Sequence, residues 1–416
     1  MDSYRIFQEA LSSIRQNKAR SALSGFGVAW GIFILTVLLG VGDGFRQGVM
    51  GMFDVFAQKS MFIYAGTTSL NYGDKSEGTE IDFTDDDLRR LRSYYSGIEA
   101  ISPEMYRTGI IARNADKDIA VSVCGVRPDY FRVKLLETGR KGRILNSLDS
   151  KGGRPVAVIG EGIATVLFGN REPEGEKIDI DGIFYTVTGV LKSDNIFSLS
   201  ERNSVYIPAE TFRAGFGDTG GFRSFCMALS PGTDMEWFEK DIRNYLAYIK
   251  GYSTDDDQAV YVSNIEAQTS SFESLFKGLN ILIWVIGICF LLSGMAGIGN
   301  VMLITVKERT SEIGIRKAIG AVPESIIKMI ILESVCITLM SGVIGIIAGT
   351  GTLFLIDKGI AAFAQDSMMG RTSVHPAAVL LSLGVLVLSG MISGLFPAVK
   401  AARIMPVDAI RYENRG

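Results

Sequence analysis

The sequence predicts an α-helical membrane bundle of four transmembrane helices, with a large α+β domain inserted between helices 1 and 2. Three observations lead to this fold class. Of the 416 residues, 47% are hydrophobic, and the mean hydropathy is +0.24, which is typical of a membrane protein. Four windows lack charged residues over a length that can cross a hydrocarbon core of about 30 Å, which takes roughly 20 helical residues. A long segment of mixed polarity separates the first window from the second.

The four uncharged windows are residues 21–42, 278–306, 334–356 and 372–399. Because a backbone inside lipid must satisfy its own hydrogen bonds, we expect a helix in each. The expected spans are 21–42, 278–306, 329–356 and 376–399. The second is longer than the hydrocarbon core requires, and we expect it to continue outward as a stiff stalk.

Lysine and arginine gather in three short segments: 1–20, 307–328 and the tail 400–416. The short loop 357–375 holds only Lys358 and Arg371. The positive-inside rule therefore places both termini in the cytoplasm and residues 43–277 outside. Acidic residues outnumber basic ones in that outer segment, which argues against a nucleic-acid surface.

Residues 1–20 are predicted to form an amphipathic helix that lies on the inner lipid headgroups. Tyr4, Phe7, Leu11 and Ile14 recur at helical spacing on one side, opposite a charged side. This pattern is typical of an interfacial helix.

The outer segment begins with a helix that Thr84 is predicted to cap. Asp85, Asp86 and Asp87 would fill the first turn, where the helix dipole favours negative charge. A metal site is the alternative for three aspartates. Consecutive helical residues point in different directions, which disfavours it.

Strands and helices then alternate through the outer segment. We expect strands at 155–159, 177–180 and 184–190, with Asp181 and Gly182 as a hairpin turn. Helices are expected at 161–168 and 234–249, which makes the domain mixed α+β. A second acidic triplet, residues 255–257, is interpreted as a solvated loop, because it lacks the alternating spacing of a calcium loop.

The composition excludes several kinds of chemistry. His375 is the only histidine, so a histidine triad or histidine metal cluster is excluded, and we interpret His375 as an interfacial residue at a helix start. A paired-carboxylate hydrolase stays open, although nothing selects a pair. The sequence has no GxxxxGK[ST] phosphate loop, and no span has a central charge, which disfavours an ion-coupled transporter. We therefore expect no catalytic, metal-binding or cofactor-binding residues.

Two features concern packing. Cys124 and Cys226 share the outer domain, so a disulfide and two free buried thiols are both open. Small residues recur four positions apart in all four spans, which allows close helix approach. These pairs are Gly27 and Gly31, Ser293 and Gly297, Gly345 and Gly349, and Gly390 and Gly394.

The loop KERTSEIGIRKAIGA, Lys307 to Ala321, is predicted to contain a helix. Glu312 and Arg316 form a favourable i, i+4 pair, and Gly320 followed by Pro323 is a stop signal. Ser311, Gly314 and Ala318 would form a flat strip that suits insertion into a groove on a partner protein. A solvated loop is the alternative, but it explains only the basic residues.

Several of these motifs resemble one family. The stretch ERTSEIGIRKAIGA resembles the cytoplasmic coupling helix of MacB/FtsX-like ABC transporter permeases, and FPAVKAARIMPVDAIRYE, Phe396 to Glu413, resembles their closing signature. The stretches DFTDDDLRRL, GVRPDYF, PVAVIGEGIATVLFG and FYTVTGVLK resemble successive parts of the MacB-type periplasmic core domain.

The resemblance implies a multi-pass permease subunit in the bacterial inner membrane. It would form a homodimer or heterodimer and couple to a cytoplasmic ABC ATPase that holds ATP and Mg²⁺. By mechanotransmission it would drive export or efflux from the periplasm, with a periplasmic adaptor and an outer-membrane channel, or lipoprotein release. The alternative is an FtsX-like regulatory subunit that activates periplasmic cell-wall hydrolases.

The resemblance also implies where the ATPase binds. The contact residues carried over from the coupling-helix motif are Glu308, Arg309, Glu312, Gly314, Arg316, Lys317 and Gly320. Fused MacB transporters begin with an ATPase domain, whereas about twenty residues precede the first span here, so we expect the ATPase on a separate chain. A membrane-anchored periplasmic enzyme would have no use for such a helix.

Overall fold

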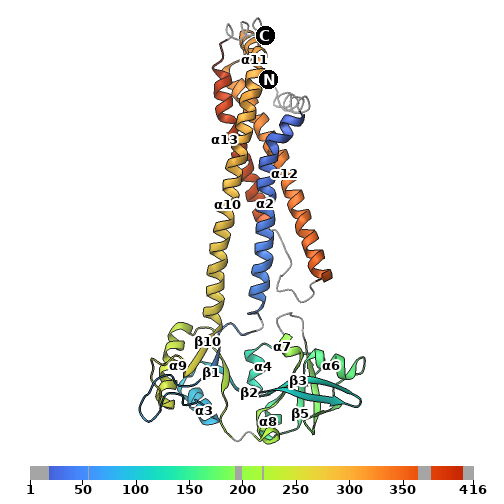
Figure 1. The fold of residues 1–416 in the computed structure, drawn as a ribbon, viewed down its shortest axis with the longest axis vertical. Helices are drawn as coiled ribbons and strands as arrows, with labels where there is room; N and C mark the ends of the chain where they lie inside the picture. The colour runs from blue at the N-terminus through green and yellow to red at the C-terminus, as the bar shows by residue number, and fades with distance from the viewer. Residues whose placement is uncertain (1–17, 55, 193–198, 218–219, 364–375, 406–416) are drawn as a thin grey trace. The chain divides into compact units, whose positions relative to one another are not determined.

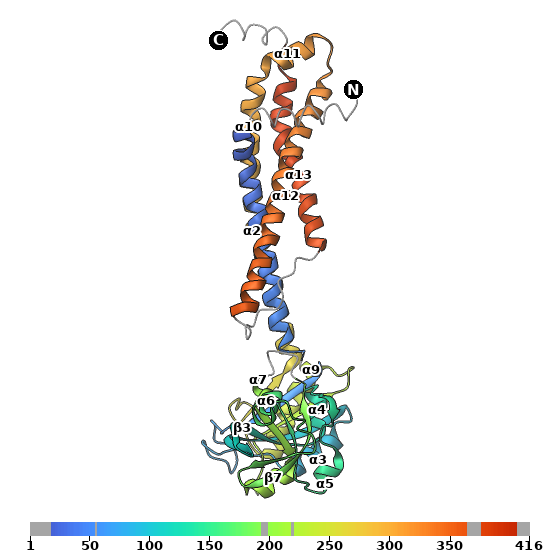
Figure 2. The same cartoon turned by 90° about the vertical axis from the view of Figure 1, so that its right-hand side faces the viewer.

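The computed structural model describes residues 18–54, 56–192, 199–217, 220–363 and 376–405. The chain divides into two compact units (Figures 1 and 2), a helix bundle from Met1–Gly48 and Leu275–Gly416 and a sheet domain, Val49–Ser274. The amphipathic helix expected within residues 1–20 falls outside the described residues except for its last three positions. His375 also lies outside them.

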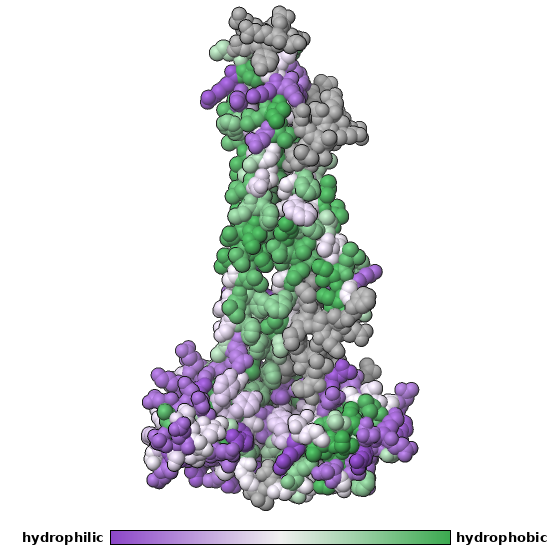
Figure 3. Space-filling view, in the orientation of Figure 1, coloured by the Kyte–Doolittle hydropathy of each residue, from purple (hydrophilic) through white to green (hydrophobic). Residues whose placement is uncertain are grey.

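Five helices carry the bundle: α2 (Lys18–Gly51), α10 (Ile265–Glu308), α11 (Thr310–Ala318), α12 (Pro323–Phe363) and α13 (Pro376–Ala402). All except α11 are long and apolar enough to cross a membrane. In Figure 3, apolar residues gather over these helices. Every predicted span therefore coincides with a helix.

Helices α2, α10 and α12 are longer than the uncharged windows that they contain. Helix α10 has 44 residues, about 66 Å at 1.5 Å per residue, and it begins 13 residues before the predicted span of 278–306. Helix α12 continues past the predicted end at 356, through Asp357 and Lys358. A hydropathy window stops at a charge, whereas a helix stops only where its backbone hydrogen bonding does.

Three of the four small-residue pairs lie where helices of the bundle meet. Gly27 and Gly31 of α2 approach α10, Gly345 and Gly349 of α12 approach α2, and Gly390 and Gly394 of α13 approach α12. A Cβ at Gly345 would lie 2.5 Å from the carbonyl oxygen of Ala29. The fourth pair, Ser293 and Gly297 of α10, is exposed in the single chain.

The sheet domain has one ten-stranded sheet in the order β10-β1-β9-β2-β3-β8-β5-β7-β4, with β6 paired to β2 and β7. Most neighbours are antiparallel, but β3 and β8, and also β5 and β7, are parallel. The strands are β1 (Ser60–Ala65), β2 (Ile98–Asn114), β3 (Lys117–Val126), β4 (Thr138–Gly142), β5 (Val156–Ile159), β6 (Lys177–Ile180), β7 (Ile183–Leu191), β8 (Ser204–Pro208), β9 (Ser224–Leu229) and β10 (Val260–Asn264).

Seven described helices accompany the sheet. They are α3 (Asp85–Tyr94), α4 (Asp129–Val133), α5 (Ser147–Lys151), α6 (Glu161–Phe168), α7 (Leu199–Arg202), α8 (Ala209–Phe216) and α9 (Met235–Lys250). Apolar clusters form on both faces of the sheet, and side chains alternate between them. On β9, for example, Phe225 and Met227 belong to the larger cluster, whereas Cys226 and Ala228 belong to the smaller one.

Local sequence signals in this domain are confirmed. Thr84 caps α3 in a capping box with Asp87. Each side chain accepts a hydrogen bond from the other residue's backbone amide, which has no partner within the helix. Strands β6 and β7 form the predicted hairpin, and Asp181 and Gly182 both have positive φ angles, 54° and 84°. Such angles are typical of a type I′ turn.

The four cysteines are free, and Cys124 and Cys226 are buried. Sheet geometry accounts for this. Cys124 lies on β3 and Cys226 on β9, with β2 between them. Neighbouring strands are about 4.8 Å apart, so the two backbones are separated by about 10 Å, which exceeds the Cα separation of about 6.8 Å that a disulfide spans.

The interpretation of residues 255–257 as a solvated loop is wrong for Asp256. This residue is only 3% exposed. Its carboxylate accepts hydrogen bonds from the backbone amides of Ser69 and Leu70 and from the Ser69 hydroxyl at 2.7–3.0 Å. Burial would raise its pKa, but these bonds outweigh it and lower the pKa below the usual value. Asp256 therefore ties two distant loops together, which an acidic triplet in sequence does not reveal.

We predict that Gly345→Leu destabilises the bundle, because its side chain would meet the backbone of α2. Overpacking of this kind costs typically about 1–3 kcal/mol, so the melting temperature of the purified chain in detergent should fall. Gly351→Leu is the matched control, since a Cβ there meets nothing within 4 Å. Equal melting temperatures for the two variants would contradict the assigned α2–α12 contact.

Candidate functional site

One residue separates α11 from the end of α10, and four residues separate it from the start of α12. The end of α11 is fixed as the sequence predicts. Gly320 has a φ of 98°, and the amides of Gly320 and Ala321 donate to the carbonyls of Lys317 and Arg316. This is a Schellman motif, which needs a residue free to adopt positive φ. Pro323 then begins α12.

Charged side chains bind α11 to itself and to α12. The predicted pair is confirmed, with Arg316 Nη2 at 2.9 Å from Glu312 Oε1. Arg309 donates to the same carboxylate at 2.8 Å and to Glu333 of α12 at 3.3 Å. The Glu333 side chain is only 5% exposed, so Arg309 offsets the cost of a buried carboxylate.

These contacts change the acidity of Glu312. The hydrogen bond from Arg309 lowers its pKa, burial opposes this, and the charges of Arg309 and Arg316 lower it further. The net pKa lies below the usual value. Glu312 is therefore charged at neutral pH and holds both arginines in place.

Lys317 reaches a different helix. Its Nζ donates to the carbonyl oxygens of Ala402 and Ile404, each at 2.8 Å. Ala402 is the last residue of α13. A cation is favourable there, because the carboxyl end of a helix carries unpaired carbonyls and the negative end of the dipole.

The predicted small-residue strip does not form one open face. Ile313 and Gly314 are buried, and Ile313 belongs to the apolar core of the bundle together with Met329 and Ala401. Ser311 is half-buried and Ala318 is exposed. Gly314 is thus covered by the chain itself, because helical spacing defines the faces of α11 but not which of them the rest of the chain covers, and its contact with a partner stays a prediction.

A different face of this segment is open. It carries the large apolar residues Ile315, Ile319 and Val322, of which Ile319 is 81% exposed. Glu308 and Gly320 are also exposed. Sequence reasoning missed the isoleucines, although their i, i+4 spacing on the side opposite Ile313 could have indicated them.

The seven predicted contact residues therefore fall into three groups. Arg309, Glu312, Arg316 and Lys317 bond within the chain. Gly314 is buried, and Glu308 and Gly320 are exposed.

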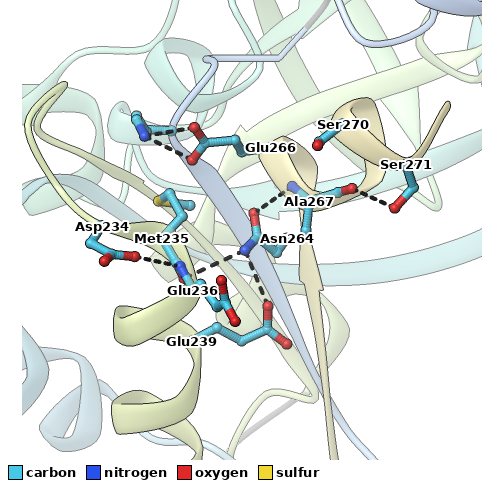
Figure 4. A pocket seen from close by; sticks show the side chains of 10 residues that line it. Asp234, Met235, Glu236, Glu239, Asn264, Glu266, Ala267, Ser270 and Ser271 are labelled. Carbon is cyan, nitrogen blue, oxygen red and sulfur yellow. Dashed lines mark hydrogen bonds and ion pairs between the residues drawn. The ribbon is translucent and has the colours of Figure 1, made fainter. Parts of the chain in front are cut away.

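The sheet domain holds a pocket of about 510 Å³ between α9, β10 and the start of α10. Figure 4 shows Asn264 directed at Glu239, and their side chains are bonded at 3.1 Å. Asp234 caps α9, and Glu266 pairs with Lys59 at 2.7 Å. These carboxylates serve local structure, and no group of three or more potential metal ligands occurs among the described residues.

A second pocket of about 480 Å³ lies beside α3 and is lined in part by Arg92, Arg127 and Asp129. Arg127 bonds to Asp85 at 2.9 Å, and Arg92 pairs with Asp129 at 3.3 Å. The pocket thus joins two of the sequence stretches quoted above, DDDLRRL and GVRPDYF, through internal ion pairs.

Each of the two units matches a known protein-family model. Residues 21–245 match the model of the MacB-like periplasmic core domain, and residues 284–406 match that of the FtsX-like permease C-terminal region. The chain is 28% identical to the macrolide export ATP-binding/permease protein MacB of Bdellovibrio bacteriovorus over 97% of its length. It spans 61% of that relative's length.

Two further similarities concern a complete permease chain and a solved structure. The chain is 29% identical to the uncharacterized ABC transporter permease YknZ of Bacillus subtilis, covering 97% of this chain and 98% of that one. Among solved structures, the periplasmic region of MacB from Actinobacillus actinomycetemcomitans is similar with a TM-score of 0.44 and 19% identity, covering 53% of this chain and 95% of that one.

We predict that the attachment of α11 weakens in acid through Glu312. Because its folded pKa is below the ordinary value of 4.5, its stabilising effect is complete above that pH and is lost as the pH falls through the folded pKa. The mobility of a spin label at Ile319→Cys should stay constant from pH 7 to about 4.5 and rise below it. The natural cysteines would first be replaced.

Glu312→Gln is the control, because an amide does not titrate. The variant should have a mobile label already at pH 7 and no rise in acid. A rise that persists unchanged in Glu312→Gln would show that another group causes the transition.

Proposed function

We propose that this chain, which belongs to the MacB/FtsX-like family of ABC transporter permeases, transmits ATP-driven motion from a cytoplasmic ATPase to its sheet domain across the membrane. ATP and Mg²⁺ would bind to the ATPase, a separate chain. The permease would lie in the bacterial inner membrane with both termini in the cytoplasm. The transmitted motion would drive export or efflux from the periplasm or the release of a lipoprotein.

One observation carries this proposal: α11 is fixed on one side and apolar on the other. Its buried side contributes Ile313 to the bundle core, and its arginines bind Glu312 and Glu333. Ile315 on its open side, and Ile319 and Val322 in the segment that follows it, are exposed. Exposed apolar residues on a rigid helix suit a groove on a partner protein. A partner that pulls or pushes on this face would move the bundle with it.

We accordingly revise the ATPase contact. It would consist of Ile315, Ile319 and Val322, with Glu308 and Gly320 retained from the seven residues of the motif. Arg309, Glu312, Arg316 and Lys317 would hold the helix in position rather than contact the ATPase.

The long helices support transmission. Helix α10 is continuous from Ile265, in the sheet domain, to Glu308, one residue before α11. A continuous helix transmits displacement along its axis, because every backbone hydrogen bond resists stretching. Motion of α11 would therefore reach the sheet domain without crossing a flexible loop.

The interior of the bundle argues against passage of cargo through it. Buried hydroxyls there bond to their own helices: Ser334 to Ile330, Thr338 to Ser334, Ser389 to Leu386 and Ser393 to Gly390. These bonds leave the hydroxyls occupied rather than lining a polar path. Work at the sheet domain fits this interior better than transport between the helices.

Two partners complete the proposal. The exposed stripe of Cys289, Ser293 and Gly297 on α10 would allow close approach of a second permease subunit. On the far side of the membrane, the sheet domain would act on a periplasmic adaptor and outer-membrane channel or on a lipoprotein. The match of residues 21–245 to the MacB-like domain favours this function over an FtsX-like activator of cell-wall hydrolases.

We predict that Ile319→Asp weakens binding of the ATPase. Burial of one isoleucine contributes about 1.5–3 kcal/mol, so the dissociation constant should rise roughly 10- to 100-fold. Pull-down from mild detergent identifies the ATPase, and titration of the purified subunits measures its affinity.

Met405→Asp is the matched control for this experiment. Met405 is also a large exposed side chain near the same end of the bundle, and its substitution should leave the affinity unchanged. If Ile319→Asp binds the ATPase as tightly as Met405→Asp does, the proposed docking face is refuted.

The sheet domain and the segment around α11 should be exposed on opposite sides of the membrane. We expect an impermeant thiol reagent added to spheroplasts to label Tyr248→Cys, which is 85% exposed on α9, and to label Ile319→Cys only after permeabilisation. The natural cysteines would be replaced first. Labelling of both positions in sealed spheroplasts would be incompatible with transmission across the membrane.

A further inference from the structure

We propose that Lys317 makes the last membrane helix, α13, move together with α11, by capping the carboxyl end of α13 with its ammonium group. This inference rests on the proposed function. It states that Lys317 of α11 couples the motion of α11 to α13.

The geometry is that of a helix cap supplied from another element. Lys317 Nζ lies 2.8 Å from the carbonyl oxygens of both Ala402 and Ile404. The last carbonyls of a helix have no partners within it, and hydrogen bonds from a cation are roughly twice as strong as neutral ones. The ammonium also lies at the negative end of the dipole of α13. A single side chain thus satisfies two carbonyls and holds the end of the helix.

Helices α10 and α12 need no such link, because short segments of the chain join them to α11. Arg309 alone separates α10 from α11, and a segment of four residues, 319–322, separates α11 from α12. Helix α13 is different, because Lys317 and Ala402 are 85 residues apart in the chain. Displacement of α11 must therefore reach α13 through non-covalent contacts, and the Lys317 bonds are direct ones.

The carboxyl end of α13 also lacks part of the stabilisation that a regular helix has. Pro397 lies inside the helix and has no amide hydrogen, so the hydrogen bond that would close the preceding turn is missing. Of the residues after it, Ala398 and Ala401 are buried in the core with only a methyl group each, and Ile404 packs against the core while partly buried. The bonds from Lys317 add a direct attachment of this helix end to α11.

The first test needs no ATPase. Spin labels at Ala318→Cys and Met405→Cys, both exposed in the native chain, report the α11–α13 distance in the full chain in nanodiscs, after replacement of the natural cysteines. With Lys317 present, the distance distribution should be narrow. Lys317→Met should broaden it, whereas Lys317→Arg, which keeps a cationic donor, should restore it.

Lys328→Met is the matched control, since Lys328 is an exposed lysine near the start of α12 and its loss changes the charge equally. Its distribution should remain narrow. Lys317→Gln replaces Lys317→Met if the latter does not fold, as judged by its melting temperature. Two outcomes would overturn the inference. The first is a distance distribution in Lys317→Met, or in its substitute Lys317→Gln, that stays as narrow as in the parent. The second is a distribution in Lys317→Arg that is as broad as in Lys317→Met.

The second test separates coupling from simple attachment. With the co-purified ATPase bound, trapping with ATP, Mg²⁺ and vanadate should leave the distance unchanged in the parent, because the two helices move together. In Lys317→Met the ATPase should still bind with parental affinity, but the trapped state should show a shifted distance. An unshifted distance in Lys317→Met would overturn the inference, whereas failure of the parent to bind an ATPase would instead refute the proposed function and leave the first test standing.

Discussion

Arg309 bridges two carboxylates on different helices, Glu312 of α11 and Glu333 of α12, and the position of α11 depends on this bridge. Glu333 is almost fully buried, and removal of one partner from a buried pair costs about 3–5 kcal/mol. The same arginine orients Glu312, which in turn holds Arg316. With these charges bonded inside the chain, the large apolar side chains that remain exposed are Ile315 on α11 and Ile319 and Val322 just after it.

The sheet domain is built on a similar rule, in which carboxylates fix segments that are distant in the chain. Asp85 binds Arg127 and Arg213, which come from different elements, at 2.9 and 2.6 Å. Asp256 holds the loop at Ser69 and Leu70. Fully satisfied polar contacts of this kind rigidify a domain. A rigid domain can respond to a pull on α10 as one body, which a loosely packed domain could not.

The sequence was sufficient for features set by local physics. The four spans, the capping box at Thr84, the hairpin at Asp181 and the glycine stop at Gly320 each depend on a few neighbouring residues, and each was predicted. Features that depend on distant segments were not. The burial of Gly314 and Asp256 and the bonds of Lys317 to α13 all require knowledge of what packs against them, which helical periodicity does not contain. The coupling-helix motif assigned a docking role to Arg309, Glu312, Arg316 and Lys317, and it could not show that all four also bond within the chain.

The separation of charged bonds within the chain from exposed apolar residues also decides which interaction can couple the permease to an ATPase. An exposed ion pair contributes only about 0.2–1 kcal/mol and is screened by salt, so a contact built from Arg309, Glu312 and Arg316 would be weak even if those side chains were free to make it. Burial of Ile315, Ile319 and Val322 would contribute about 1.5–3 kcal/mol for each side chain, although association offsets part of that sum. An apolar contact is also insensitive to direction. A helix that a partner both pushes and pulls therefore gains from apolar side chains on the face that contacts the partner. It also gains from charged, directional bonds on the face that contacts the bundle. The segment around α11 has both.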